Sequence, residues 1–193
     1  MIYHEQFDRY SFNQLKSFWG ILEELKGKYA HNSTIPDVIN RDKVAFQIMY
    51  SYGLSPNELL MLKYEDIDIN SNEQLFKCIL INECGRNRII YPIFIDAFAE
   101  IEMFLKRNIS KVNNPSNFIF TTETNKPISK CYLNHRLKYY NSYLSDKDKL
   151  FSLYIFRQLY IADLLRLKDI SLTFIYKQSG TSLVNNHLYD YLY

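Results

Sequence analysis

Apolar residues recur at helical spacing along most of this chain, and one pair of β-rich runs interrupts the pattern. Between residues 10 and 29, large apolar side chains stand three or four positions apart, as they do on one face of a helix. They are Phe12, Leu15, Phe18, Trp19, Leu22 and Leu25. Similar patterns follow at 41–53, 95–108, 128–144 and 152–168. We therefore predict a mainly helical fold.

Length and composition agree with this prediction. The chain has 193 residues, 47% of them hydrophobic, which is enough to build one core. Five Gly and five Pro are too few for the many tight turns of an all-β sandwich. Because no repeat, linker or low-complexity run divides the sequence, we expect one domain over residues 1–193, with its first helix at about 10–29.

The turn between two predicted helices is well marked. Gly53 follows a largely apolar run and is suited to the left-handed conformation that ends a helix. Ser55 and Pro56 then provide a helix cap and a first-turn proline, and Glu58 stands where the partner of a capping box belongs. This pattern predicts that a second helix starts at once.

Two short runs at 75–82 and 88–94 are rich in β-branched and other apolar residues. Gly85 lies between them and suits the positive φ of a hairpin loop. We predict a small antiparallel hairpin in a mainly α domain, and a short extended segment at 117–122.

Several function classes are disfavoured. The N-terminus carries charges where a signal peptide needs an apolar core, and no apolar stretch is long enough to span a membrane, so we expect a soluble cytoplasmic protein without a membrane partner. Cys78, Cys84 and Cys131 follow no metal-binding or paired spacing. We interpret them as buried thiols and predict no metal and no cofactor.

The charge is unevenly distributed. The net charge is only +2, but residues 126–177 contain ten Lys and Arg against four Asp. Such a surplus is compatible with a basic face for a polyanion and equally with an ordinary solvated surface.

Four stretches, taken together and in order, resemble the catalytic domain of tyrosine recombinases, the phage integrases. The first resembles the family's box in which a Thr-Gly-Leu-Arg turn leads into Glu-Leu, Leu and an Asp-Ile-Asp ending, and the residues that fit are Gly53, Leu54, Glu58, Leu59, Leu62, Asp66 and Ile67. The second, a hairpin, resembles the strand pair that normally presents a lysine, and the third resembles a Gly-Lys-Pro-Ile-Ser segment before a helix. The fourth parallels a His-x-x-Arg helix, a Leu-Gly-His turn and a terminal tyrosine. They cover 44–69, 83–93, 118–140 and 154–189. The family-like region therefore spans about residues 43–191.

The resemblance implies phosphoryl transfer from DNA to a tyrosine hydroxyl, with two arginines clamping the phosphate and Lys and His groups assisting. Most of these positions are replaced here. The first arginine falls on Ser55, the lysine near Cys84 beside Glu83, and the first histidine on Tyr154. The second arginine is retained as Arg157.

The end of the family pattern is also altered. Thr181 takes the place of the second histidine after the retained Gly180, and the nucleophile falls at Tyr189 or, as an alternative, at Tyr191. Arg157 and Tyr189 are the catalytic residues that an active version of this site would use.

We therefore expect a non-catalytic, integrase-like protein that binds double-stranded DNA, as a regulator or accessory factor of a phage or mobile element. Phosphate contacts supply most DNA affinity and do not require the cutting residues. The candidate contacts are Arg86, Arg88, Lys130, Arg136, Lys138 and Arg157. A second protein or domain is a further expected partner that completes a clamp around DNA. Two alternatives stay open: a divergent active recombinase and a helical protein-interaction module.

Overall fold

The computed structural model describes residues 12–68, 77–81, 87–92, 97–109, 114, 116–145, 150–167 and 170–180. Most of these residues are helical, and three short strands lie between the 3-10 helix η1 and helix α5. In chain order the elements are α2 (Phe12–Lys28), α3 (Ile35–Tyr52), α4 (Pro56–Met61), η1 (Tyr64–Asp66), β1 (Ile67–Asp68), β2 (Lys77–Ile81), β3 (Asn87–Ile90), α5 (Phe98–Ile109), α6 (Lys130–Asn141), α7 (Leu153–Arg166) and α8 (Leu172–Ser179).

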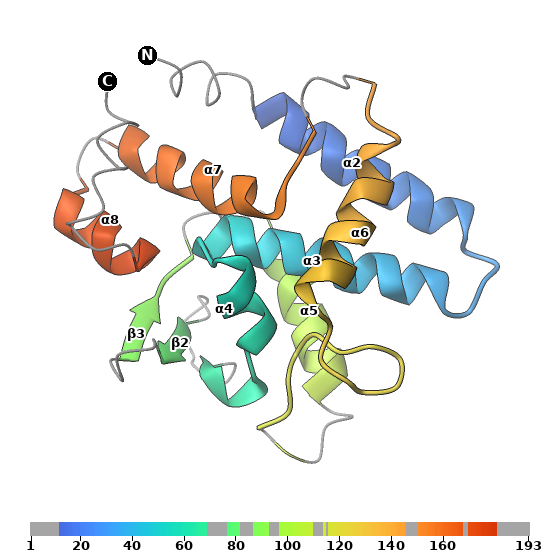
Figure 1. Ribbon diagram of the computed structural model, residues 1–193, viewed down its shortest axis with the longest axis horizontal. Coiled ribbons are helices and arrows are strands. Elements are labelled where there is room, and N and C mark those ends of the chain that lie inside the picture. The colour runs from blue at the N-terminus through green and yellow to red at the C-terminus, as the bar shows by residue number, and fades with distance from the viewer. Residues whose placement is uncertain are drawn as a thin grey trace.

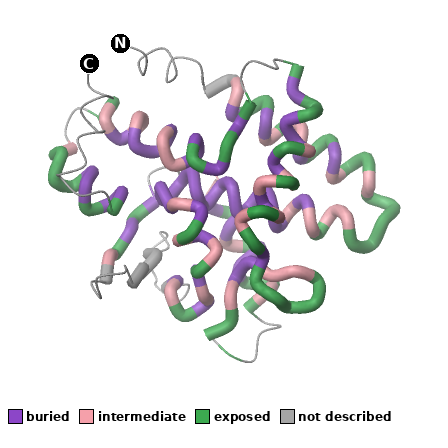
Figure 2. The backbone as a smooth tube through the Cα atoms, viewed as in Figure 1, coloured by how far each residue is buried: buried purple, intermediate pink, exposed green. Residues whose placement is uncertain are grey.

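Helix α3 lies at the centre of the molecule. It crosses the middle of Figure 1 and packs against α2, α4, α5 and α7. Thirteen of its 18 residues are buried, so the helix is enclosed on nearly every side, as the purple tube in Figure 2 shows. These four helices are therefore positioned by what they contact on α3.

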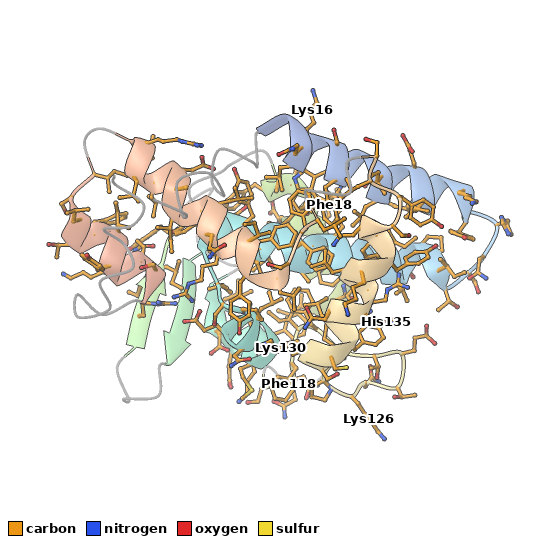
Figure 3. All side chains as sticks on the ribbon, turned by 45° about the horizontal axis from the view of Figure 1, so that its top comes forward. Lys16, Phe18, Phe118, Lys126, Lys130 and His135 are labelled. Atoms are coloured by element: carbon orange, nitrogen blue, oxygen red, sulfur yellow. The ribbon has the colours of Figure 1, made fainter. Side chains whose placement is uncertain are left out.

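Aromatic rings join three helices in the core. Phe46 of α3 stacks on Phe156 of α7 with ring centroids 5.2 Å apart, and Phe18 of α2 lies 4.6 Å from Phe151. Figure 3 shows Phe18 pointing from α2 into this cluster. Such ring pairs contribute roughly 0.5–1.5 kcal/mol each beyond the burial of their area. They hold α7 against α3 and so fix the position of Arg157, which α7 carries.

The three strands form one antiparallel sheet in the order β1-β2-β3, with Cys78 opposite Ile90. Helix α8 packs beside β3, at the edge of the sheet. The Gln178 side chain accepts a hydrogen bond from the Tyr91 backbone N–H (2.9 Å) and donates one to the Ile89 carbonyl (3.3 Å). A side-chain amide therefore takes part of the role of a neighbouring strand and ties α8 to the sheet.

The predicted helices and hairpin are present among the described residues, with two differences. Strand β1 adds a third strand that the sequence patterns did not indicate. The segment expected to be extended at 117–122 forms only isolated bridges, Lys63 with Phe118 and Thr121 with Pro127. Residues 181–193 lie outside the described residues.

The expectation of buried thiols is wrong for Cys131, which is exposed. Cys131 lies on the outer side of α6 with His135 and Lys138, while Leu133 and Leu137 point into the core. The phase of the helix, and not the usual preference of cysteine for the interior, decides its environment. The side chains of Cys78 and Cys84 are outside the described part.

Candidate nucleic-acid interface

The turn between α3 and α4 is built as its sequence predicts. Gly53 ends α3 with φ of 63°, and a Cβ there would overlap the ring of Tyr160 on α7. The hydroxyl of Ser55 accepts a hydrogen bond from the Glu58 N–H (3.2 Å), and the Glu58 carboxylate accepts one from the Ser55 N–H (2.7 Å). This capping box fixes the Glu58 carboxylate at the start of α4.

The same carboxylate holds two arginines that are distant in sequence. Arg88 of β3 donates from Nη2 to Oε1 of Glu58 at 2.6 Å, and Arg157 of α7 donates from Nη1 to Oε2 at 2.8 Å. Nη2 of Arg157 also donates to the Ser179 carbonyl at the end of α8. Ser55, Glu58, Arg88 and Arg157 are called the Glu58 cluster below. It joins α4, β3, α7 and α8 at one point.

This cluster is positively charged and only partly exposed. The exposed fractions of the Arg88, Arg157 and Glu58 side chains are 10%, 16% and 26%. Burial lowers the pKa of the Arg88 guanidinium; Glu58 counteracts the effect and Arg157 adds to it. Because two guanidiniums share one carboxylate, one positive charge is left over.

Tyr154 lies one helical turn before Arg157 on α7, and Lys130 of α6 contacts it. Nζ of Lys130, at the start of α6, donates to the Tyr154 hydroxyl at 2.7 Å and lies 4.7 Å from the centre of its ring. Tyr154 is 50% exposed and precedes Arg157 by three residues, so the two side chains occupy the same face of α7. Lys130 is therefore placed on the side of α7 that carries the Glu58 cluster.

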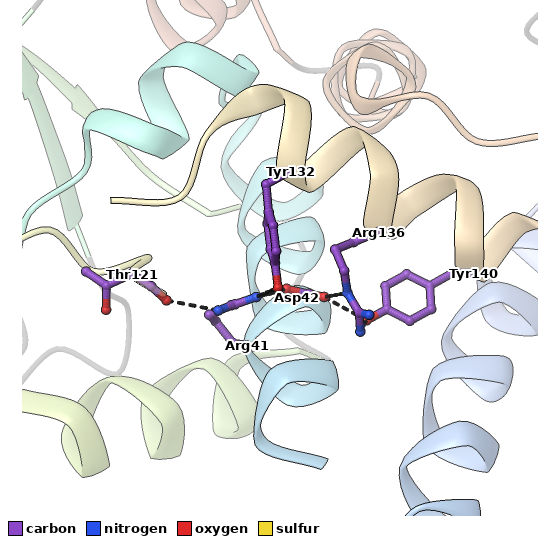
Figure 4. A network of polar contacts seen from close by, with 6 residues as sticks. All are labelled: Arg41, Asp42, Thr121, Tyr132, Arg136 and Tyr140. Carbon is purple, nitrogen blue, oxygen red and sulfur yellow. Dashed lines mark hydrogen bonds and ion pairs between the residues drawn. The ribbon is translucent and has the colours of Figure 1, made fainter. Parts of the chain in front are cut away.

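Arg136 is placed in a second network, the Asp42 cluster, which Figure 4 shows between α3 and α6. Its members are Arg41, Asp42, Tyr132, Arg136 and Tyr140. Asp42 is completely buried and accepts hydrogen bonds from Arg41 (2.7 Å), Arg136 (2.7 Å) and Tyr140 (2.7 Å). Arg41 also donates to the Tyr132 hydroxyl at 2.8 Å, and Nη2 of Arg136 donates to the Tyr140 hydroxyl at 2.5 Å.

Arg136 thus has an internal partner that sequence reasoning missed. Its side chain is 21% exposed and lines, with Tyr132 and Glu123, a groove of about 420 Å³. Of the other expected contacts, Lys138 is exposed on the outer side of α6. Arg86 and Tyr189 lie outside the described residues, as do Cys84 and Thr181.

The structure therefore brings Arg88 and Arg157 together and places Lys130 on the same face of α7 as Arg157, whereas Arg136 belongs to another cluster. The sequence patterns indicate Glu58 as a capping residue and as part of the family's first box, but they do not indicate that it is the common partner of both arginines. The sequence gives one hint of this role. Glu58 stands three residues after Ser55, the position at which the resemblance expects the first arginine.

Other site types find little support in the part of the chain that is described. There, no group of three or more His, Cys, Asp and Glu side chains is arranged to hold a metal ion. No described helix combines the length and the apolar character required to cross a bilayer.

Comparison with solved structures gives the same fold. The XerH site-specific recombinase, in a pre-cleavage complex with its difH substrate, is similar at 15% identity with a TM-score of 0.72, over 94% of this chain and 49% of that chain. A Tn1549 transposon integrase in complex with transposon right-end DNA is similar at 15% identity with a TM-score of 0.61, over 95% and 61%. The XerA recombinase is similar at 14% identity with a TM-score of 0.58, over 88% and 57%. The chain thus spans about half to three fifths of the length of these proteins.

A search of curated protein sequences finds no match. The model of the phage integrase family, in contrast, matches residues 24–180, which is most of the chain and includes every residue of the Glu58 cluster. The chain therefore belongs to the phage integrase family.

Proposed function

We propose that this chain binds double-stranded DNA through the Glu58 cluster and does not cleave it. The observation that carries the proposal is the pair of arginines, Arg88 and Arg157, held on one carboxylate with a positive charge left over. A guanidinium pair is suited to the oxygens of a backbone phosphate. The XerH recombinase and the Tn1549 integrase, which share this fold, were solved in complexes with DNA, which supports the same partner here.

The proposed contact surface extends from the Glu58 cluster to α6. Its phosphate contacts are Arg86, Arg88, Lys130, Arg136, Lys138 and Arg157. Arg136 has a smaller role in this proposal, because its Nε and Nη2 atoms already donate to Asp42 and Tyr140. Arg86 enters on its place in the sequence alone.

The family's first arginine and first histidine are replaced in this chain, which leads us to propose that it does not cleave DNA. Ser55 is uncharged and its hydroxyl is used as a helix cap, and Tyr154 stands where the family resemblance expects a histidine. An arginine aimed at a transferring phosphoryl group can be worth ~10³ to 10⁵ in rate. A site that has Ser55 in place of the family's first arginine, and that lacks the usual proton donors, retains the means to hold a phosphate but loses most of the chemistry.

In biological terms, we propose a regulator or accessory factor of a phage or mobile element. A protein that occupies DNA without cutting it can compete with an active recombinase or with transcription. We also propose that a second protein or domain completes the grip, since one face of a duplex leaves the other open to such a partner.

The proposal is tested by binding and by a cleavage trap. Fluorescence anisotropy with a mixed-sequence duplex should show affinity that falls steeply as salt rises, because each phosphate contact releases a counterion. A nicked suicide duplex should give no covalent protein–DNA adduct. Binding that is absent, or that does not respond to salt, would instead favour a protein-interaction module.

A divergent active recombinase is the second candidate. It is favoured by Lys130, whose ammonium lies 2.7 Å from the Tyr154 hydroxyl and therefore supplies a cation near a position where the family uses a proton-transferring group. In that case the suicide duplex yields an adduct, and Tyr189→Phe abolishes it. That result would overturn the non-catalytic proposal.

A further inference from the structure

A cleft of about 630 Å³ lies between the first half of α3, the end of α5 and the segment 117–125. Its volume falls within the range of sites that hold small molecules, roughly 300–1,000 Å³. None of the proposed phosphate contacts of the DNA-binding surface lines this cleft. It is therefore a second candidate site, separate from the Glu58 cluster.

Hydrogen bonds hold the segment 117–125 in place along the cleft. Nη1 of Arg41 donates to the Thr121 carbonyl at 2.9 Å, and Figure 4 shows this arginine reaching from α3 to Thr121. The Asn117 carbonyl accepts a hydrogen bond from the Tyr64 N–H at 3.2 Å. The cleft is thus formed before any ligand binds, as sites for small molecules usually are.

The charges on the lining of the cleft cancel. The charged residues that line it are Asp37, Arg41, Arg107 and Glu123. Arg107 of α5 pairs with Asp37 of α3 at 3.2 Å. Burial raises the pKa of Tyr64, which also lines the cleft, to about 12, so its hydroxyl stays neutral. Unlike the Glu58 cluster, this lining has no surplus positive charge for a phosphate, and it suits an uncharged ligand.

Aromatic rings and polar side chains share the lining. Tyr64 and Phe104 are buried, and Phe118 beside them is half-buried. Amide and hydroxyl groups, which both donate and accept hydrogen bonds, come from Asn40, Asn108, Asn117, Asn125, Thr121 and Thr122. Aromatic side chains stack on flat rings, and asparagine amides bind the donors and acceptors at the edge of adenine.

We infer that this cleft binds a purine nucleoside, an uncharged flat ring system with donors and acceptors along its edge. The amides of Asn40 on α3 and Asn117 on the segment 117–125 bind the edge of the base, and the rings of Phe104 and Phe118 contact its face. The inference concerns a second ligand, so its test has the same meaning whether or not the chain binds DNA.

Titration calorimetry of the full-length chain with adenosine tests the site. Asn40→Ala removes one amide from the cleft, and Asn134→Ala is the matched control, because Asn134 is also half-buried on a helix but does not line the cleft. Adenosine should bind Asn134→Ala as it binds the unchanged chain. It should bind Asn40→Ala on the order of tenfold more weakly, as expected when a hydrogen-bonding group of the ligand loses its partner.

A blocking variant and two other ligands complete the test. Asn117→Trp, at an exposed position, places a large side chain in the cleft and should abolish binding. Adenosine monophosphate should bind no more tightly than adenosine, and methyl glucoside, which has no flat ring, should bind far more weakly. Thermal melting checks the folding of each variant. The nucleoside site is overturned if the unchanged chain does not bind adenosine, if folded Asn117→Trp binds it equally well, or if methyl glucoside binds more tightly.

Discussion

The Asp42 cluster and the Glu58 cluster are built on the same plan, with one carboxylate between two arginines, but they differ in how completely they are closed. Asp42 is fully buried, and two tyrosine hydroxyls complete its surroundings. The Glu58 side chain is 26% exposed, and the Nε atom of Arg88 has no partner among the described residues. The same charges therefore serve an internal joint in one place and an open site in the other.

The difference lies in the elements that surround each carboxylate. Asp42 projects from the middle of the central helix α3 toward α6, where aromatic side chains cover it. Glu58 projects from the first turn of a short helix toward Arg88 on the edge strand β3 and Arg157 on α7. Tyrosines therefore close the Asp42 cluster, whereas the Glu58 carboxylate stays partly in contact with solvent.

The largest expected effect follows from removing the buried carboxylate. Asp42→Asn leaves Arg41 and Arg136 without their common anion in the interior, and breaking such a buried pair typically costs about 3–5 kcal/mol. Urea unfolding should show a loss of this order. If the loss is below about 1 kcal/mol, typical of surface ion pairs, the Asp42 cluster is not the internal joint described here.

Glu58→Gln should cost less, about 1–3 kcal/mol, because the carboxylate is partly hydrated and Arg157 also donates to the Ser179 carbonyl. DNA should raise the melting temperature of this variant more than that of the unchanged chain, since a bound phosphate supplies the missing negative charge. Asp42→Asn is the matched control and should gain no such extra protection. Equal protection of both variants would remove the distinction between an open and a closed cluster.

The sequence predicts one of these clusters in part and the other not at all. A capped helix is predicted from Ser55, Pro56 and Glu58, because a capping box depends on neighbouring residues only. The structure contains this capping box. That Arg88 and Arg157 meet on Glu58 depends on how a sheet edge and a distant helix pack, which no local pattern encodes. Strand β1 was missed for a similar reason, since a two-residue strand carries no periodicity.

The sequence does not indicate the Asp42 cluster, because it consists largely of charged residues in a part of the chain where exposure is the usual expectation. Charged residues are usually exposed, so the run of Arg41, Asp42 and Lys43 suggests a solvated start to an apolar helix. All three are in fact buried, and Lys43 is paired with Glu23 (2.6 Å) and Glu100 (2.8 Å). The partners explain the burial, and apart from the Arg41–Asp42 pair within α3 they come from other parts of the chain.

Arg157 and Arg136, both predicted as DNA contacts, should differ in their effects on DNA binding and on stability. Arg157→Ala should weaken binding to a mixed-sequence duplex by on the order of tenfold, as expected for a lost charged contact. Arg136→Ala should weaken it less and should lower the free energy of unfolding more, because it leaves Asp42 with one arginine instead of two. Anisotropy and urea unfolding of both variants, with Arg166→Ala as control, measure the contrast. A larger binding defect in folded Arg136→Ala would shift the interface toward α6.

The smallest expected effect concerns alkaline pH and the Tyr140 hydroxyl, which donates a hydrogen bond to Asp42 in the closed cluster. Burial, reinforced by the negative charge of Asp42, raises the pKa of Tyr140 above its ordinary value of 10.0. Above about pH 10 the unfolded chain therefore loses this proton while the folded chain keeps it, so the free energy of unfolding falls as pH rises. Tyr140→Phe should lose about 1 kcal/mol at neutral pH with its hydrogen bond to Asp42, yet decline less steeply above pH 10. Parallel curves for the variant and the unchanged chain would mean that the Tyr140 proton is not held by the Asp42 cluster.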